Sequence, residues 1–323
     1  MEPLTHPIKT SFERGAAKGW QGFFWMSKII LPVSFVTFLL DYSGWLDQMD
    51  SWLEPLMGAI HLPAMAALPL LAGLLTGIYG AIAAISVLPF TVDQMTLMAV
   101  FLLIAHSLIQ EGLVQRQSGC PAWMATAVRL TAAVLTVFVL GWMVGPESAE
   151  KAAGDPLASV RTMFWPAMRG WAAAMAWLSM KILLIITALM IFMEILKRYR
   201  LIDRVVRIIE PILGLLGLDR QVGVLWMTAV VFGITYGGAV IVAETRERRL
   251  SPDQLKTLHV SIGINHAMVE DPSLFLPLGV HPFWLWIPRL VTAVAFTQAY
   301  RLWLWMKNSR QPIAGVTVPL DGS

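Results

Sequence analysis

Long apolar stretches alternate with short polar segments along almost the whole chain. A helix that crosses a bilayer needs about 20 mainly apolar residues. Four stretches reach that length, at 23–40, 124–145, 171–196 and 283–305. Two shorter stretches, 95–111 and 255–271, are marginal spans, and two more, 62–90 and 218–244, are broken near their middles by glycine. The pattern predicts an all-α polytopic membrane protein.

Composition supports this interpretation and narrows the class of protein. Of the 323 residues, 57% are hydrophobic and 14% are charged, whereas about 25% of an ordinary soluble domain is charged. A soluble enzyme and a disordered chain are therefore excluded. The single cysteine, Cys120, excludes an internal disulfide and a cysteine-rich metal centre. The net charge of +3 comes from short basic clusters between apolar stretches, so no nucleic-acid partner is predicted.

The distribution of lysine and arginine predicts the orientation of the chain in the membrane. Three basic residues lie in 1–21, five in 197–209 and four in 246–256, whereas 41–63 has none. Both termini are therefore expected in the cytoplasm, with the protein integral to the cytoplasmic (inner) membrane. In this orientation the two glycine-broken stretches each enter and leave the membrane on one side. They are predicted to be re-entrant helical hairpins beside six transmembrane helices.

The two halves of the chain resemble each other. From Asp93 to Leu130, matching motifs keep an offset of 160, give or take one. The motifs that match in order include Glu54-Pro55 with Glu210-Pro211, Gly77-Ile78 with Gly233-Ile234, His106 with His266, and Arg129 with Arg289. By the charge pattern the first helices of the two halves run in opposite directions. The halves are therefore predicted to be inverted-topology repeats, a recurrent plan of secondary transporters.

The repeat also predicts how the chain is divided. The expected parts are a cytoplasmic N-terminal segment (1–21), repeat one (22–145), an external linker (146–170), inverted repeat two (171–306) and a cytoplasmic tail (307–323). Two short amphipathic segments, 47–57 and 202–215, are expected to form helices that lie along the membrane interfaces.

The glycine-rich bends of the two hairpins are the first candidate for substrate binding. Glycine frees backbone N–H and C=O groups from helical pairing, and neighbouring tyrosines and threonines add hydroxyls at the same depth. Close packing of helices through small residues is the alternative interpretation. The candidate substrate-binding residues at the bends are Gly77, Tyr79, Gly80, Gly233, Thr235, Tyr236, Gly237 and Gly238.

Polar residues within the predicted spans are the second candidate. His106, His266 and Asn265 are expected to contact substrate or to relay a proton, since imidazole titrates near neutral pH. Charged residues at membrane depth are costly unless they are paired or face a cavity. Ligand contact and a structural ion-pair network therefore both remain open. The charge network comprises Lys28, Lys181, Arg129, Arg289, Glu111, Glu270 and Asp271.

No catalytic residue, metal site or cofactor is predicted. His266 and Glu270 are an i, i+4 pair that could bind a metal, but Gln110 replaces the acid in repeat one, so a symmetric metal site is not supported. The chain contains neither a His-Glu-x-x-His nor a Gly-x-Ser-x-Gly motif, and we expect no enzyme activity. A coupling ion, H⁺ or Na⁺, fits the predicted plan.

Taken together, these motifs resemble a known family. A span, a Glu-Pro interfacial helix, a Gly-Tyr-Gly hairpin and a His-containing helix occur twice over residues 22–306. This arrangement resembles the nucleoside-recognition, or Gate, membrane domain. Related domains form the membrane part of ferrous-iron transporter B, occur in spore maturation proteins A and B, and are similar to halves of concentrative nucleoside transporters. The resemblance implies a transport-type fold.

The function predicted from these features is secondary transport by alternating access. The expected substrate is a small polar solute bound between the hairpin bends at the bilayer midplane, and the lysines and arginines favour an anion. The alternative is a non-transporting membrane partner or assembly protein that keeps the Gate fold. Besides the solute and the lipid bilayer, the partner classes left open are a second copy of the chain and another membrane protein.

Overall fold

A computed structural model describes residues 7–144, 163–199 and 250–309, together with 213–218, 222–223, 225–231, 233 and 242. Over these residues the protein is helical and contains no strand. The first half forms α1 (Pro7–Ser43), α2 (Trp45–Gly58), η1 (Ala64–Ala66), α3 (Ala67–Thr76), α4 (Ile78–Ile85), α5 (Val92–Ala105), α6 (Leu108–Gln117) and α7 (Ala122–Val144). The second half forms α9 (Phe164–Arg198), α12 (Pro252–Ile264), α13 (Glu270–Ser273), η3 (Leu276–Leu278) and α14 (Pro282–Ser309).

Among the described residues, four segments are long and apolar enough to cross a membrane. They are Lys9–Ser43, Val92–Gln117, Ala122–Val144 and Phe164–Leu196. Two of them contain the long stretches predicted at 23–40 and 171–196, a third covers the stretch at 124–145 as far as Val144, and the fourth contains the marginal stretch at 95–111. The stretches at 255–271 and 283–305 are largely helical as α12 to α13 and α14, and their place in a membrane remains a prediction.

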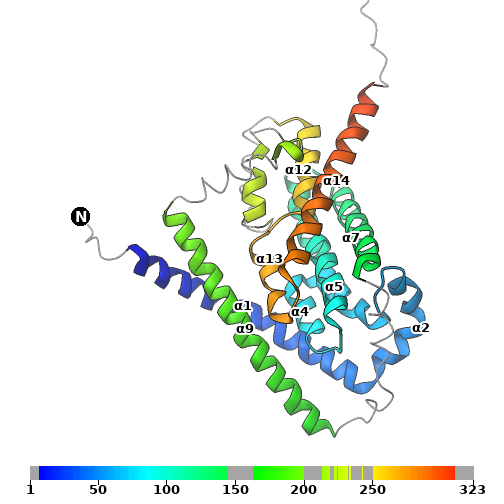
Figure 1. The fold of residues 1–323 in the computed structure, drawn as a ribbon, viewed down its shortest axis with the longest axis vertical. Coiled ribbons are helices and arrows are strands. Elements are labelled where there is room, and N and C mark those ends of the chain that lie inside the picture. Colours follow the sequence, from blue (N-terminus) through cyan, green and yellow to red (C-terminus); the bar gives the residue numbers. More distant parts are fainter. Residues whose placement is uncertain are drawn as a thin grey trace, which may run out of the picture.

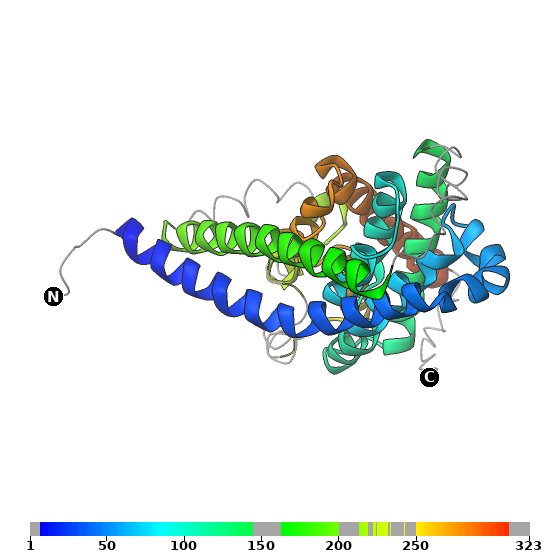
Figure 2. The same ribbon diagram turned by 90° about the horizontal axis from the view of Figure 1, so that it is seen from below.

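Helices α1 and α9 run side by side in opposite directions (Figures 1 and 2). The ring of Tyr42, near the end of α1, lies 5.4 Å from that of Phe164 at the start of α9. Near the other ends, the Lys18 Nζ atom lies 2.6 Å from Glu194 Oε1. These helices begin the two halves of the chain, so the opposite directions inferred from the charge pattern are present in this pair.

Close backbone approach explains why α1 begins well before the apolar stretch that starts at residue 23. A Cβ atom added to Gly19 would lie only 2.6 Å from the Cα atom of Thr187, and Gly15 faces the backbone of Ile191 just as closely. Small residues that let helix backbones approach are typical of helix pairs in membranes. The N-terminal end of α1 is thus held against α9 by packing that the hydropathy pattern does not reveal.

The core of the remaining structure is formed by α5, α7, α12 and α14. Helix α5 packs against α7, α12 packs against α14, and each pair also contacts the other. Helix α5 lies at the centre (Figure 1), and its residues from Thr96 to Ala105 are all buried. The two pairs are corresponding parts of the repeat, so equivalent segments of the two halves meet inside this core.

The predicted bend of the first hairpin lies at Gly77. Helix α3 ends at Thr76, Gly77 adopts φ 95° and ψ −178°, and α4 begins at the next residue. A Cβ atom added to Gly73 would lie 3.0 Å from the Cβ atom of Ala81, so α4 turns back against α3. In the second hairpin, Gly233 also has a positive φ of 76°. Re-entry of these segments into a membrane remains a prediction.

The structure describes the first of the two predicted interfacial helices in full and only the end of the second. Residues 47–57 lie within helix α2, as expected. Of residues 202–215, only 213–215 lie among the described residues, where they are helical. The position of either segment at a membrane surface remains a prediction.

Candidate functional site

Two corresponding helices break beside their histidines. Helix α5 ends at Ala105 and α6 begins at Leu108, with Ser107 in the left-handed region at φ 47°. In the second half, Ala267 has φ 46° in the break between α12 and α13. Positive φ is uncommon for residues other than glycine. The sequence analysis predicted marginal spans at 95–111 and 255–271 and did not predict these breaks within them.

The backbone N–H groups freed by the breaks bond to the hairpin helices. Ser107 N donates to the carbonyl oxygen of Gly73 in α3 at 3.0 Å, and Ala267 N donates to that of Ala229 at 3.0 Å. A buried N–H group without a partner is costly. Each break is therefore stabilised by a segment far away in the sequence.

Two buried arginines satisfy the carbonyl groups left free at the same breaks. Arg129 Nε donates to the carbonyl of Ile104 at 2.9 Å, and its Nη2 donates to that of His106 at 2.6 Å. Arg289 makes the same pair of bonds in the second half, at 2.6 Å each, to the carbonyls of Ile264 and His266. A cation at a helix C-terminus is favoured by the unpaired carbonyls and the helix dipole. Both arginines thus have a structural role in holding a broken helix end.

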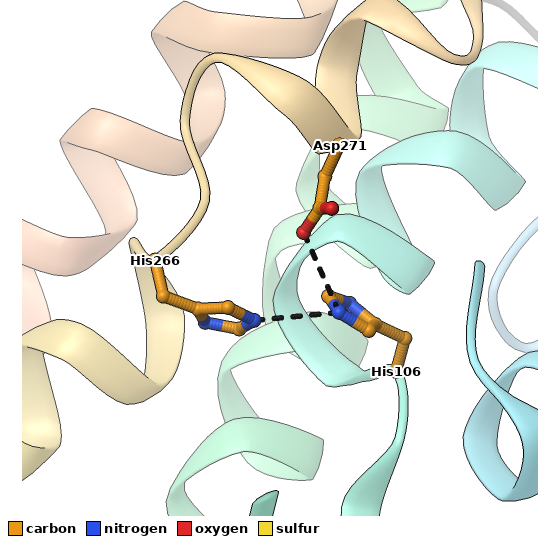
Figure 3. A group of neighbouring side chains, drawn as sticks. All are labelled: His106, His266 and Asp271. Atoms are coloured by element: carbon orange, nitrogen blue, oxygen red, sulfur yellow. Dashed lines mark hydrogen bonds and ion pairs between the residues drawn. The ribbon is translucent and has the colours of Figure 1, made fainter. Parts of the chain in front are cut away.

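The two histidines point their rings at each other. His106 Nδ1 lies 2.8 Å from the carbonyl oxygen of Leu102, and His266 Nδ1 lies 3.0 Å from that of Ile262. The two Nε2 atoms are 3.4 Å apart, as Figure 3 shows. The His106 and His266 residues are 6% and 1% exposed, so this contact is closed to solvent.

Two carboxylates complete this cluster. Glu111 Oε1 lies 3.1 Å from the Nε2 atom of each histidine, and Asp271 Oδ2 lies 3.4 Å from His106 Nε2 (Figure 3). We call His106, His266, Glu111 and Asp271 the histidine–carboxylate cluster. Each half of the chain contributes one histidine and one acid to it.

The two acids, Glu111 and Asp271, differ in their contacts with the neighbouring arginines. Glu111 Oε2 lies 2.9 Å from Arg129 Nη1 and forms one of the ion pairs that the sequence left open. Asp271 is one methylene shorter, and Arg289 Nη1 has no hydrogen-bond partner in the described part of the chain. The second half therefore keeps a buried guanidinium nitrogen free to bond something else.

Other polar atoms without partners gather at this second break. Neither amide atom of Asn265 has a hydrogen-bond partner within the described residues, although the residue is fully buried, and Asp271 Oδ2 has no hydrogen bond either. Buried polar atoms are nearly always bonded to protein or to ordered water. The Asn265 amide and Arg289 Nη1 therefore keep hydrogen-bonding capacity that the described residues do not use, whereas Asp271 Oδ2 has the approach to His106 Nε2 at 3.4 Å.

The hairpin bends lie against the two breaks. A Cβ atom on Gly77 would lie 2.6 Å from Ser107 Oγ, and one on Gly233 would lie 3.3 Å from the Cβ atom of Ala267. The Tyr79 hydroxyl donates to Glu270 Oε1 at 3.0 Å and so links the first hairpin to the second half.

The other predicted site residues lie away from the cluster or cannot be placed. Gly80 is buried within α4. Lys28 is exposed on α1, and Lys181 donates to the carbonyl of Pro277 at 3.2 Å. Four of the predicted bend residues lie outside the described residues: Thr235, Tyr236, Gly237 and Gly238.

Comparison with known proteins supports the family resemblance. Residues 179–278 match the Gate family, described as nucleoside recognition; this segment includes Gly233, α12 and His266. The chain is also 29% identical over 303 residues, covering 90% of this chain and 94% of the relative, to the "Uncharacterized membrane protein YvoD" of Bacillus subtilis (strain 168). No solved structure matches the chain. One segment of the chain thus matches the Gate family, and the chain is similar to a membrane protein along nearly its whole length.

Proposed function

We propose that the chain is a secondary transporter that moves a small polar solute by alternating access. The observation that carries the proposal is the pair of broken helices, which repeat the same arginine, histidine and hairpin bonds in both halves of the chain. Inverted repeats whose discontinuous helices meet at the substrate site are a recurrent plan of secondary transporters. In this proposal the two halves lie inverted in the inner membrane, with both termini cytoplasmic.

The proposed solute site lies at the second break and the adjoining hairpin bends. Asn265 offers a donor and an acceptor, Arg289 Nη1 offers a donor, and all three atoms lack partners in the described structure. A polar solute bound here would satisfy them, and the guanidinium favours an anion. The proposed coupling ion is H⁺, with Na⁺ as the alternative.

Uptake into proteoliposomes tests the proposal. We expect the purified chain to accumulate at least one of radiolabelled uridine, glutamate and orthophosphate under an imposed H⁺ or Na⁺ gradient, above protein-free liposomes. Asn265→Ala should lower that uptake about tenfold, because a lost hydrogen bond to a bound solute costs up to about 1.5 kcal/mol.

A matched variant and a second outcome make this test decisive. Thr297→Val removes a buried hydroxyl that donates to Ala293 within its own helix at 2.6 Å, so its uptake should equal that of the wild type. If none of the three solutes enters and the folded chain instead co-purifies with another membrane protein, the alternative of a non-transporting partner replaces the proposal.

Cysteine labelling tests the inverted orientation. In intact cells, a membrane-impermeant maleimide should label Asp47→Cys from outside, and should label Asp203→Cys only after permeabilisation. The native thiol of Cys120 should remain unlabelled, because it is buried and burial raises its pKa to about 11. Almost no thiolate therefore forms at pH 7. Wild-type protein unfolded in detergent at pH 9 is the positive control for Cys120. Equal labelling of both variants from one side contradicts the inverted orientation.

A further inference from the structure

We propose that the histidine–carboxylate cluster binds one divalent transition-metal ion, with His106, His266, Glu111 and Asp271 as its ligands. The proposal goes beyond transport, since it concerns binding at a closed site and holds whether or not the chain moves a solute. It stands on hydrogen-bond direction, donor spacing and burial.

The direction of the histidine hydrogen bonds leaves three hydrogen-bond acceptors, the two Nε2 atoms and Glu111 Oε1, facing one another. Each Nδ1 faces a backbone carbonyl, at 2.8 Å for His106 and 3.0 Å for His266. A carbonyl can only accept, so Nδ1 must carry the proton, and in a neutral imidazole Nε2 then carries a lone pair. Both lone pairs point at Glu111 Oε1, which is also an acceptor. A cation bound between these three acceptors would attract all of them and so remove their mutual repulsion.

The spacing of these atoms suits a metal ion. The two Nε2 atoms and Glu111 Oε1 form a triangle with edges of 3.1, 3.1 and 3.4 Å. Ligands at about 2.0–2.1 Å from a tetrahedral zinc ion are about 3.3–3.4 Å apart, so the triangle has the size of one face of that tetrahedron. Asp271 Oδ2 lies 3.4 Å from His106 Nε2 and is the nearest remaining donor for a fourth position. Ligand atoms of His106, His266 and Asp271 all lie within 4.8 Å of one another.

The surroundings orient the ligands as they do in metal sites. Metal-binding histidines commonly donate their other N–H group to a backbone carbonyl, and ligand carboxylates are themselves hydrogen-bonded. Both histidines follow this pattern, and Glu111 is held by an ion pair instead: its Oε2 atom lies 2.9 Å from Arg129 Nη1, while Oε1 faces the histidines. These three contacts therefore pre-orient three of the four ligands.

Charge and ligand type predict which metals bind. The two arginines offset the two carboxylates, so attraction for a cation comes from the donor atoms rather than from net charge. Imidazole ligands favour Zn²⁺, Co²⁺ and Ni²⁺, whereas Mg²⁺ and Ca²⁺ prefer sites made wholly of oxygen. We expect Zn²⁺ and Co²⁺ to bind and Mg²⁺ not to bind.

Metal titration of the purified chain in detergent, after removal of metals with a chelator, tests the proposal. We expect one Zn²⁺ per chain by calorimetry, visible absorption bands typical of tetrahedral Co²⁺, and a rise in melting temperature with added Zn²⁺. His106→Gln or His266→Gln should weaken Zn²⁺ binding about 100-fold or more, since even outer-shell changes cost 10–100-fold. The double variant should lose the Co²⁺ bands.

His259→Gln is the matched control. Like the two cluster histidines, His259 is buried. It lies within α12, however, and its Nε2 atom faces Ser118 Oγ at 3.1 Å rather than the cluster. Its variant should bind Zn²⁺ as the wild type does. Absence of Zn²⁺ and Co²⁺ binding by folded wild type, or full binding by the folded double variant, overturns the site. Because binding is measured without transport, it can fail while uptake persists, and uptake can fail while binding persists.

Discussion

Arg129→Met is expected to lower the free energy of unfolding by about 3–5 kcal/mol, the cost of removing one partner from a buried ion pair. The substitution leaves Glu111 charged and buried beside Arg129's former position, and it leaves the carbonyls of Ile104 and His106 without their donor. A chain with a stability of 5–15 kcal/mol loses a large part of it. The measurement is unfolding in mixed micelles with increasing SDS, followed by circular dichroism.

Three further variants separate the causes of that loss. Arg129→Met combined with Glu111→Met should recover part of the stability, because the unpaired charge is gone while the free carbonyls remain. Arg289→Met should cost less than Arg129→Met, since Arg289 Nη1 has no partner to lose among the described residues. Arg116→Ala, at an exposed position, should change stability by less than about 0.5 kcal/mol. An Arg129→Met protein as stable as the wild type contradicts a structural role for this side chain.

The parts of the fold that could be predicted are those encoded by local sequence. The stretches at 124–145 and 171–196 are mainly apolar, and their only charged residues are Arg129, Lys181 and Glu194. The first forms α7 as far as Val144, and the second forms part of α9. The bend at Gly77 was predictable because only glycine readily adopts its φ of 95°. The early start of α1 was not, because residues near Gly15 and Gly19 are helical through contact with α9.

The helix breaks could not be predicted, because their stability comes from distant residues. Neither Ser107 nor Ala267 is a helix breaker of the glycine or proline kind. Each takes its strained conformation because two distant groups satisfy the freed backbone atoms. One is an arginine that lies 23 residues after the histidine of the same break, and the other is a hairpin carbonyl. The intrinsic helix propensity of a residue contains no information about contacts with distant residues.

The candidate site was predictable as a set of residues but not as a geometry. The repeat marked His106 with His266 and Glu111 with Asp271, because the same residue types recur at one spacing. It could not show that corresponding residues meet across the halves. The corresponding residues meet because both halves place them near the contact between α5 and α12. That contact is set by the packing of the helices and cannot be read from the sequence. For the same reason the sequence could only note that the spacing of His266 and Glu270 would allow them to bind a metal, whereas in the structure Glu270 accepts a hydrogen bond from Tyr79.

Gly77→Val is the second substitution expected to have a large effect. Gly77 combines φ 95° with ψ −178°, a region essentially restricted to glycine, and forcing another residue there costs about 1–3 kcal/mol. Its new side chain would also begin 2.6 Å from Ser107 Oγ, and overpacking of a tight core adds about 1–3 kcal/mol. We expect a total loss of about 2–6 kcal/mol, measured by the same unfolding in SDS mixed micelles.

The effect should reach the candidate site as well as stability. Moving the bend away from Ser107 lengthens the bond from Ser107 N to the Gly73 carbonyl at 3.0 Å, and this bond supports the break that positions His106. Adding Ser107→Gly removes the nearest side chain and should restore the packing part of the loss but not the backbone part. Gly58→Ala, which meets no atom within 4 Å, should leave stability unchanged. If Gly77→Val unfolds at the wild-type SDS concentration, the bend at Gly77 does not exist in the folded protein, and the proposed support of the first helix break by the hairpin fails with it.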